Sequence, residues 1–193
     1  MIKICFATNN KNKLQEIREI LVNEAEILSL EDINCHEELQ ETQPTIEGNS
    51  LQKAQYVFDK YGINCFADDT GLLVEALDGA PGVYSARYAG EPSNGENNMK
   101  LLLQNLEGIE NRKAHFKTVI TYISAKETVQ FEGIVNGNIA TAKKGEKGFG
   151  YDPIFVPEGY TQSFAELSSE EKNKISHRGI ATRKLEEYLQ AIS

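Results

Sequence analysis

The chain has few cysteines and no long apolar segment. Cys5, Cys35 and Cys65 are its three cysteines among 193 residues. An odd count with two members in apolar, strand-like runs indicates reduced, buried thiols in a cytoplasmic protein. No window approaches the roughly 18 apolar residues of a membrane-spanning helix, and the start MIKICFATNN is too short for the apolar core of a signal sequence. We therefore expect no membrane partner.

An excess of positive charge is also missing. Lys and Arg number 20 against 29 Asp and Glu, which gives a formal net charge of −9. Binding a nucleic-acid backbone needs clustered Lys and Arg, so we expect no nucleic-acid partner. An acidic chain can still bind one small anionic molecule where a few cations converge. Its carboxylates also suit Mg²⁺, which prefers oxygen ligands.

The hydrophobic pattern predicts an α/β fold with a mixed central sheet flanked by helices. We expect strands at residues 2–7, 27–30, 65–67, 72–74, 115–124, 128–135 and 137–142. Helices are expected at residues 12–21, 45–61, 97–106, 168–174 and 179–192, with Asn12 and Gln15 as a capping box for the first. Residues 1–193 are expected to form a single domain of two lobes, and a cleft between lobes is a natural ligand site.

The stretch CFATNNKNK changes abruptly from a buried strand to side-chain amides and ammonium groups. Each Asn amide can donate two hydrogen bonds and each Lys ammonium three. Free backbone N–H groups at a helix N-terminus also favour an anion. Thr8, Asn10 and Lys13 could therefore surround a phosphate. A solvated turn with helix caps is the alternative interpretation.

The stretch FADDTGL places two carboxylates after a short apolar strand. Strand alternation sends Asp68 and Asp69 to opposite faces, so one can face a ligand while the other braces the loop. Such a pair can hold a cation or orient water as a general base, although an exposed turn would look the same. Glu41, in an acidic loop, can add a further metal ligand. Lys53 borders the apolar face of a helix, where it either reaches inward or lies along the surface.

A glycine-rich stretch, GEKGFGYD, places Phe149 between two glycines. Its ring can stack on a nucleobase, and Asp152 can accept a hydrogen bond from a base N–H; packing of Phe149 into the core is the alternative. Further along, Lys172, His177 and Arg178 bring donors suited to a base carbonyl or a phosphate. Each signal is weak alone, but their sum points to a nucleotide with a divalent cation.

These motifs together resemble the inosine triphosphate pyrophosphatase family. The resemblance covers nearly the whole chain and rests on ATNNKNKLQEI, ETQPTIEGNSLQKA, ADDTGLLVEALDGAPGVYSARYAG, GFGYDPIF and ISHRGIA, in this order. It implies hydrolysis of ITP, dITP and XTP to the monophosphate and pyrophosphate with Mg²⁺. It also implies an elongated α/β fold and a homodimer.

The resemblance assigns roles to individual residues. It implies that the triphosphate is bound by Thr8, Asn9, Asn10, Lys11, Asn12 and Lys13, joined by Lys53. Asp69 is implied as general base and metal ligand, with Glu41 and Asp68 as further metal-site carboxylates. We expect Asp69, Lys13 and Lys53 to carry catalysis. Thr70 matches a substrate-contacting Ser or Thr, and the base is implied to be bound by Phe149, Gly150, Tyr151, Asp152, Lys172, His177 and Arg178.

The first motif departs from the family pattern at Asn9, where Gly is frequent. Asn is the residue other than Gly that best tolerates a left-handed backbone, so the turn can survive this replacement. Two rival functions stay open. A relative of the Maf-like proteins would act on modified pyrimidine triphosphates, and a nucleotide-binding module would bind without metal-dependent hydrolysis. Lys13, Asp69 and Phe149 are expected to meet at one crevice.

Overall fold

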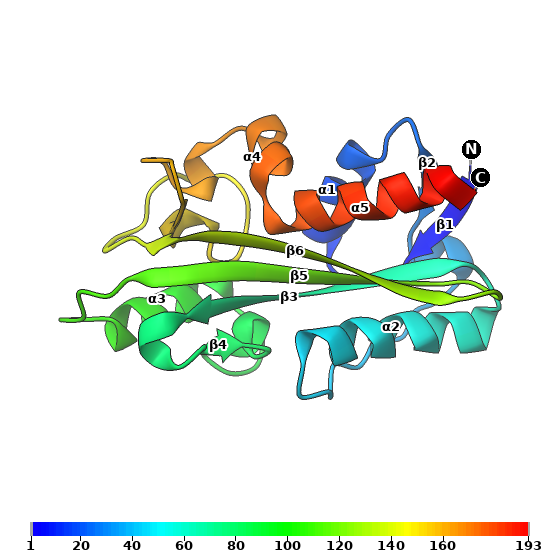
Figure 1. Cartoon of the computed structure of the whole chain (residues 1–193). Coiled ribbons are helices and arrows are strands. Elements are labelled where there is room, and N and C mark those ends of the chain that lie inside the picture. The colour runs from blue at the N-terminus through cyan, green and yellow to red at the C-terminus, as the bar shows by residue number, and fades with distance from the viewer. Residues whose placement is uncertain (1, 193) are drawn as a thin grey trace. The chain divides into compact units, whose positions relative to one another are not determined.

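A mixed seven-stranded sheet forms the centre of the fold (Figure 1). The computed structural model of the chain describes residues 2–192. The strand order is β2 (Ala25–Leu28), β1 (Ile2–Phe6), β3 (Cys65–Val74), β5 (Lys113–Ile123), β6 (Thr128–Ile139) and β7 (Phe155–Pro157), with β4 (Pro81–Gly82) paired to β3. β1 runs parallel to β2 and β3, whereas β4 and β7 are antiparallel to β3 and β6. The predicted mixed sheet is confirmed.

Helices account for most of the remaining regular structure. The α-helices are α1 (Lys11–Ile20), α2 (Ile46–Tyr61), α3 (Gly95–Asn105), α4 (Ser169–Ile175) and α5 (His177–Ile192). Short 3₁₀ helices are η1 (Glu31–Ile33), η2 (Glu75–Leu77), η3 (Ser85–Arg87), η4 (Asp152–Ile154) and η5 (Phe164–Glu166). No helix within residues 2–192 has both the length and the apolar character needed to cross a membrane.

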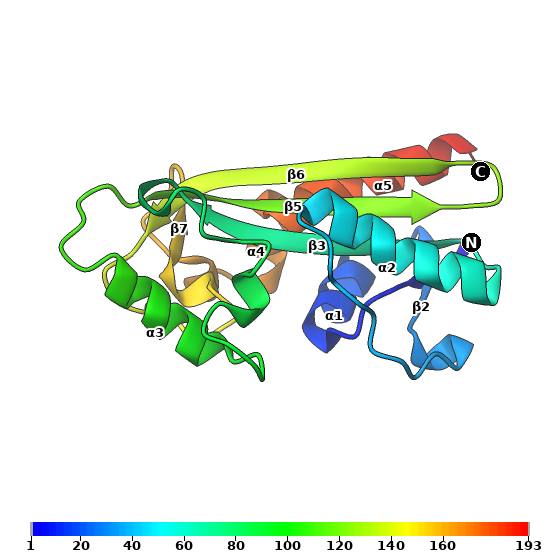
Figure 2. The same cartoon turned by 90° about the horizontal axis from the view of Figure 1, so that it is seen from below.

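The chain forms two compact units. The first comprises Met1–Asp69, Thr118–Gly133 and Arg178–Ser193, and the second comprises Thr70–Lys117 and Ile134–His177. β3, β5 and β6 contribute residues to both units. Figure 2 shows β5 and β6 side by side, and they are neighbours in the sheet.

Side-chain alternation in β1 and β3 divides the core of the first unit. Ile4 and Phe6 pack in one cluster with Phe66 and with side chains of α1 and α5. Cys5 and Cys65 pack in another cluster with side chains of α2. Figure 1 shows α1 and α5 on one face of the sheet and α2 on the other. All three cysteines are free and buried, as predicted.

The core of the second unit is rich in aromatic side chains. Met99 and Leu102 of α3 pack in one cluster with Phe116, Phe155 and Phe164. The ring centroids of Phe116 and Phe155 lie 4.6 Å apart. Several non-local segments therefore share one apolar centre, which positions the glycine-rich loop that precedes η4.

The structure corrects the predicted start of α1. Asn10, not Asn12, is the N-cap, because its extended backbone (φ −91°, ψ 108°) lets its side chain accept hydrogen bonds from the amides of Asn12 and Lys13. Two other helices also have side-chain caps: Thr45 caps α2, and Ser168 and Glu171 form a capping box on α4.

Two strand predictions are also wrong. β3 does not stop after residue 67 but continues through Asp68 and Asp69 to Val74, because it is paired with the neighbouring strands β5 and β4. The separate strand expected at residues 137–142 is instead the end of β6, which stops at Ile139. Glycine is needed at position 137 of this strand because β7 lies close. A Cβ there would be 2.4 Å from the carbonyl oxygen of Val156.

Candidate functional site

The bend between β1 and α1 is held by its own polar side chains. The Oγ1 of Thr8 accepts a hydrogen bond from the backbone N–H of Asn10 at 3.1 Å. The Oδ1 of Asn10 accepts from the backbone N–H groups of Asn12 at 2.9 Å and Lys13 at 3.2 Å. Two of the helix N-terminal amides expected to face an anion are therefore bonded to the cap.

The backbone of Asn9 is not left-handed. In residues 2–192, positive φ outside glycine occurs at Asn34 and Asp78. The side chain of Asn9 instead contacts a distant segment: its Nδ2 donates to the carbonyl oxygen of Glu37 at 3.2 Å, and its Oδ1 accepts from the backbone N–H of Leu39 at 3.0 Å. The turn therefore survives with Asn in place of Gly, and it forms without a left-handed residue at this position.

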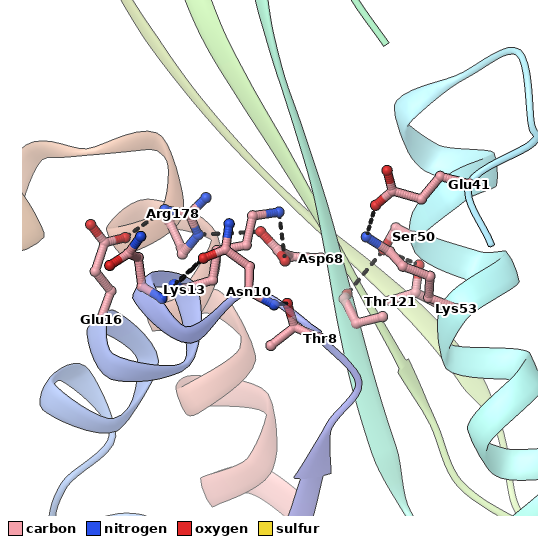
Figure 3. Close-up of polar contacts among 12 residues, drawn as sticks. Thr8, Asn10, Lys13, Glu16, Glu41, Ser50, Lys53, Asp68, Thr121 and Arg178 are labelled. Atoms are coloured by element: carbon pink, nitrogen blue, oxygen red, sulfur yellow. Dashed lines mark hydrogen bonds and ion pairs between the residues drawn. The ribbon is translucent and has the colours of Figure 1, made fainter. Parts of the chain in front are cut away.

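Asp68 lies on the face of β3 that carries α1 and α5. Its Oδ1 accepts from the ammonium of Lys13 at 3.1 Å, and its Oδ2 accepts from the Nε of Arg178 at 3.2 Å (Figure 3). The guanidinium of Arg178 also forms an ion pair with Glu16. Burial alone would raise the pKa of Asp68, but Lys13 and Arg178 hold it well below its usual range. The Asp68 carboxylate is thus ionised at neutral pH and fixes both cations.

Asp69 lies on the opposite face of β3, toward α2. Its side chain is 6% exposed, and its Oδ2 has no hydrogen-bond partner in the part of the chain that the structure describes. Burial raises the pKa of Asp69 to about 6, against the opposing charges of Lys53 and Lys13. The carboxylate is therefore ionised at neutral pH yet basic enough to accept a proton.

Lys53 reaches inward from α2 rather than along the surface. It is 5% exposed and forms an ion pair with Glu41 (Figure 3). Burial alone would lower the pKa of Lys53, but the carboxylate of Glu41 reverses this effect and raises it. The α2 face of β3 therefore gathers Lys53, Glu41 and Asp69.

A complete metal centre is not prebuilt from side chains. No three His, Cys, Asp or Glu residues within 2–192 are grouped as metal ligands would be. Asp69 fits a metal ligand because its Oδ2 is buried without a hydrogen-bond partner in the same range, and Glu41 supplies a second carboxylate of the kind Mg²⁺ prefers. Asp68 fits less well, since both of its oxygens bind cations of the protein.

The burial of Asp69 predicts a pH-dependent stability. We expect Asp69→Asn to stabilise the metal-free protein above about pH 6. The carboxyl pKa is about 6 in the folded protein and about 3.9 in an unfolded chain, so ionisation opposes folding. This penalty is absent below about pH 4, grows as the pH rises toward 6, and is fully present above it, at up to about 3 kcal/mol.

Urea unfolding with a chelator, at about pH 4 and about pH 7.5, measures the difference between variant and wild type. The matched control is Asp59→Asn on the exposed side of α2, where Asp59 accepts a hydrogen bond from Gln55. The control should not reproduce the gain in stability that Asp69→Asn shows at about pH 7.5. A gain from Asp69→Asn that does not change with pH would contradict the prediction.

In the second unit, Asp152 connects two residues of the predicted base site. Its Oδ2 accepts from the ammonium of Lys172 at 2.7 Å and from the backbone N–H of Phe149 at 3.0 Å. The Lys172 ammonium also lies 4.9 Å from the centroid of the Phe149 ring, a cation–π distance. Phe149 is only partly buried. Gly148 is required here, since a Cβ would lie 2.1 Å from the Asp152 Oδ2.

The remaining predicted base residues have defined contacts in the same unit. Tyr151 is buried and donates its hydroxyl to the carbonyl oxygen of Ser85 at 2.7 Å. The ring of His177 stacks on Phe116 with 4.3 Å between centroids. Sequence reasoning missed Ser85 and Phe116, and no local signal could have found them. Glu16 was missed too, although its place three residues after Lys13 puts both on one helix side.

Thr70 and Gly150 are the last two of the predicted site residues. Thr70 is partly buried and follows Asp69 directly in β3. Gly150 has φ +60°, and a Cβ added there would meet no atom within 4 Å. Its backbone conformation, rather than crowding, therefore favours glycine at this position.

The fold and the site define an α/β protein with buried lysines beside a carboxylate of raised pKa, a combination suited to an anionic substrate. The Ham1 family model matches residues 4–188, and the chain belongs to this family.

Known proteins similar to the chain agree with this assignment. A dITP/XTP pyrophosphatase of Flavobacterium johnsoniae is 55% identical, with 98% of this chain and 99% of the relative covered. The solved structure of the Staphylococcus aureus Ham1 protein matches with a TM-score of 0.89 and 38% identity, over 99% and 100% of the two chains. A HAM1 protein from Coxiella burnetii matches with a TM-score of 0.90 and 34% identity, over the same shares.

Proposed function

We propose that this protein hydrolyses non-standard purine nucleoside triphosphates, namely dITP, XTP and ITP, to the monophosphate and pyrophosphate. The observation that carries the proposal is the buried Asp69, with its raised pKa, close to the charges of Lys13 and Lys53. The name of the Flavobacterium johnsoniae relative, dITP/XTP pyrophosphatase, supports the substrate class.

The proposed reaction needs water to attack the α-phosphorus, which already carries negative oxygens. Lys13 and Lys53 offset that charge and orient the triphosphate. Asp69 accepts the proton of the attacking water, for which a carboxylate with a pKa of about 6 is ionised at neutral pH. Asp68 keeps Lys13 in place through their ion pair at 3.1 Å.

Mg²⁺ is the proposed cofactor. Asp69 and Glu41 are the residues that would hold it, and Asp68 is the third predicted carboxylate. When bound, the ion offsets phosphate charge and aligns the leaving pyrophosphate. Because Glu41 pairs with Lys53 in the protein alone, we propose that this ion pair rearranges on substrate binding.

Base selection is proposed for the second unit. Phe149 offers a partly exposed ring for stacking, and Lys172 and His177 supply donors for the 6-oxo group of hypoxanthine or xanthine. Adenine would present an amino group to these donors, a mismatch that can discriminate by about 10⁴-fold in favourable cases.

Since Asp68 and Glu16 bind Arg178, we propose that Arg178 supports the phosphate-binding residues. Further proposed contacts are Thr8, the backbone of Asn9, Asn10, Lys11, Asn12, Thr70, Gly150, Tyr151 and Asp152.

We further propose that residues 1–193 act as one functional domain in a cytoplasmic homodimer. The free, buried thiols support a reducing compartment, and the family resemblance supports the dimer.

The test is pyrophosphate release from dITP, XTP, ITP, GTP, ATP and a modified pyrimidine triphosphate, with and without Mg²⁺. We expect Mg²⁺-dependent release, with kcat/KM for dITP and XTP at least about 100-fold above that for ATP. Faster turnover of the pyrimidine substrate would favour the Maf-like function. Binding without release would identify a nucleotide-binding module.

A further inference from the structure

The segment that carries Glu41 lacks regular structure. Residues 37–43 belong to neither a helix nor a strand, so no helix or sheet ladder fixes their position. Leu39 is buried, whereas most of the segment is exposed. Other contacts must therefore determine where the Glu41 carboxylate lies.

One end of this segment is fastened by Asn9. The Asn9 amide donates to the carbonyl oxygen of Glu37 at 3.2 Å and accepts from the N–H of Leu39 at 3.0 Å. Two opposed hydrogen bonds to alternate residues resemble the pairing of two strands, but here one side chain makes both. A primary carboxamide is required because it offers a donor and an acceptor side by side.

The other end of the segment is fastened by α2. The Gln52 side chain accepts from the N–H of Thr42 at 2.9 Å and donates to the Thr42 hydroxyl at 2.8 Å. Asn49 accepts from the N–H of Gln43 at 2.8 Å. Glu41 lies between the two attachments and reaches Lys53.

We propose that Asn9 is a positioning residue that fixes the Glu37–Leu39 end of this segment, so that Glu41 is held beside Lys53 and Asp69. Asn9 thereby links the bend that carries Lys13 to the segment that carries Glu41. The catalytic consequence rests on the proposed function, but the attachment itself does not. Gly has no side chain that could make these two hydrogen bonds. Asn9 therefore contributes contacts that the glycine frequent in the family at this position cannot make.

Amide hydrogen exchange in the metal-free, substrate-free protein tests the attachment. Asn9→Ala removes the acceptor of the Leu39 N–H, so the Leu39 amide should exchange about 10-fold faster, the factor for one hydrogen bond. Asn9→Asp keeps an acceptor but loses the donor to Glu37, so Leu39 should stay more protected than in Asn9→Ala. Gln52→Ala should speed exchange at Thr42 instead, because the second attachment is separate.

The matched control is Gln55→Ala on α2, where the exposed Gln55 amide donates to Asp59 at 2.7 Å. This control should leave the exchange of Leu39 and Thr42 unchanged. Equal Leu39 exchange in wild type and Asn9→Ala overturns the proposal, and so does a wild-type Leu39 amide that exchanges as fast as in an unstructured peptide.

Steady-state kinetics test the consequence for the site. We expect Asn9→Ala to raise the Mg²⁺ concentration for half-maximal pyrophosphate release from dITP by about 10-fold, as losses of groups that orient metal ligands do. The KM for dITP at saturating Mg²⁺ should change less than about threefold, a split that general destabilisation would not produce. Faster Leu39 exchange with unaltered Mg²⁺ dependence overturns the positioning role. A wild type that releases no pyrophosphate refutes the proposed function, while the exchange result still decides the attachment.

Discussion

Asp69→Asn is expected to lower the rate of pyrophosphate release by about 10²- to 10⁴-fold, the range for removal of a general base. The amide has nearly the shape of the carboxyl group but cannot accept the proton of the attacking water. Lys13 and Lys53 remain, so the triphosphate should still bind. Single-turnover rates and equilibrium binding of dITP separate the two effects.

The stability of this variant makes the kinetic result interpretable. Because burial holds the pKa of Asp69 at about 6, replacing the carboxyl group should stabilise the metal-free protein at neutral pH, so unfolding cannot account for a lost rate. Asp59→Asn, an exposed site on α2, should retain wild-type turnover. If Asp69→Asn hydrolyses dITP at more than about a tenth of the wild-type rate, another group is the base.

Arg178→Met is expected to destabilise the fold by about 3–5 kcal/mol, the usual loss when one partner of a buried ion pair is removed. The Arg178 side chain is 3% exposed and binds the carboxylates of Asp68 and Glu16. Met fills similar volume but deprives the fully buried Asp68 of its guanidinium partner, while the ion pair with Lys13 stays. The pKa of Asp68 should then rise, because one of the two charges that oppose burial is gone.

Chemical denaturation at neutral pH measures this loss, and Arg18→Met is the matched control. Arg18 pairs with Asp32 at 3.4 Å, with the two side chains 48% and 49% exposed. An exposed pair of this kind contributes at most about 1 kcal/mol, and the hydrogen bonds from Arg18 to the carbonyl oxygen of Ile27 add about 1 kcal/mol. Comparable losses at the two positions would show that Asp68 does not depend on Arg178.

Short-range patterns were sufficient for much of the fold. The helices expected at residues 45–61 and 168–174 and the β-rich run around residues 115–135 each depend on residues close in sequence, and α2, α4, β5 and β6 are found there. The wrong end of the strand at residue 67 has a non-local cause. A string such as DDTG favours a turn locally, but pairing with neighbouring strands kept β3 extended through Asp68 and Asp69.

The sequence by itself determined the α/β class, the family and the residue types of the site, because these depend on composition, period and motif order. Only the tertiary structure decided which groups each side chain of the site contacts. Asp68 meets an arginine 110 residues away, and Asn9 meets a carbonyl 28 residues away. Such contacts depend on which side chains packing brings together across the sheet, and no local pattern encodes that choice.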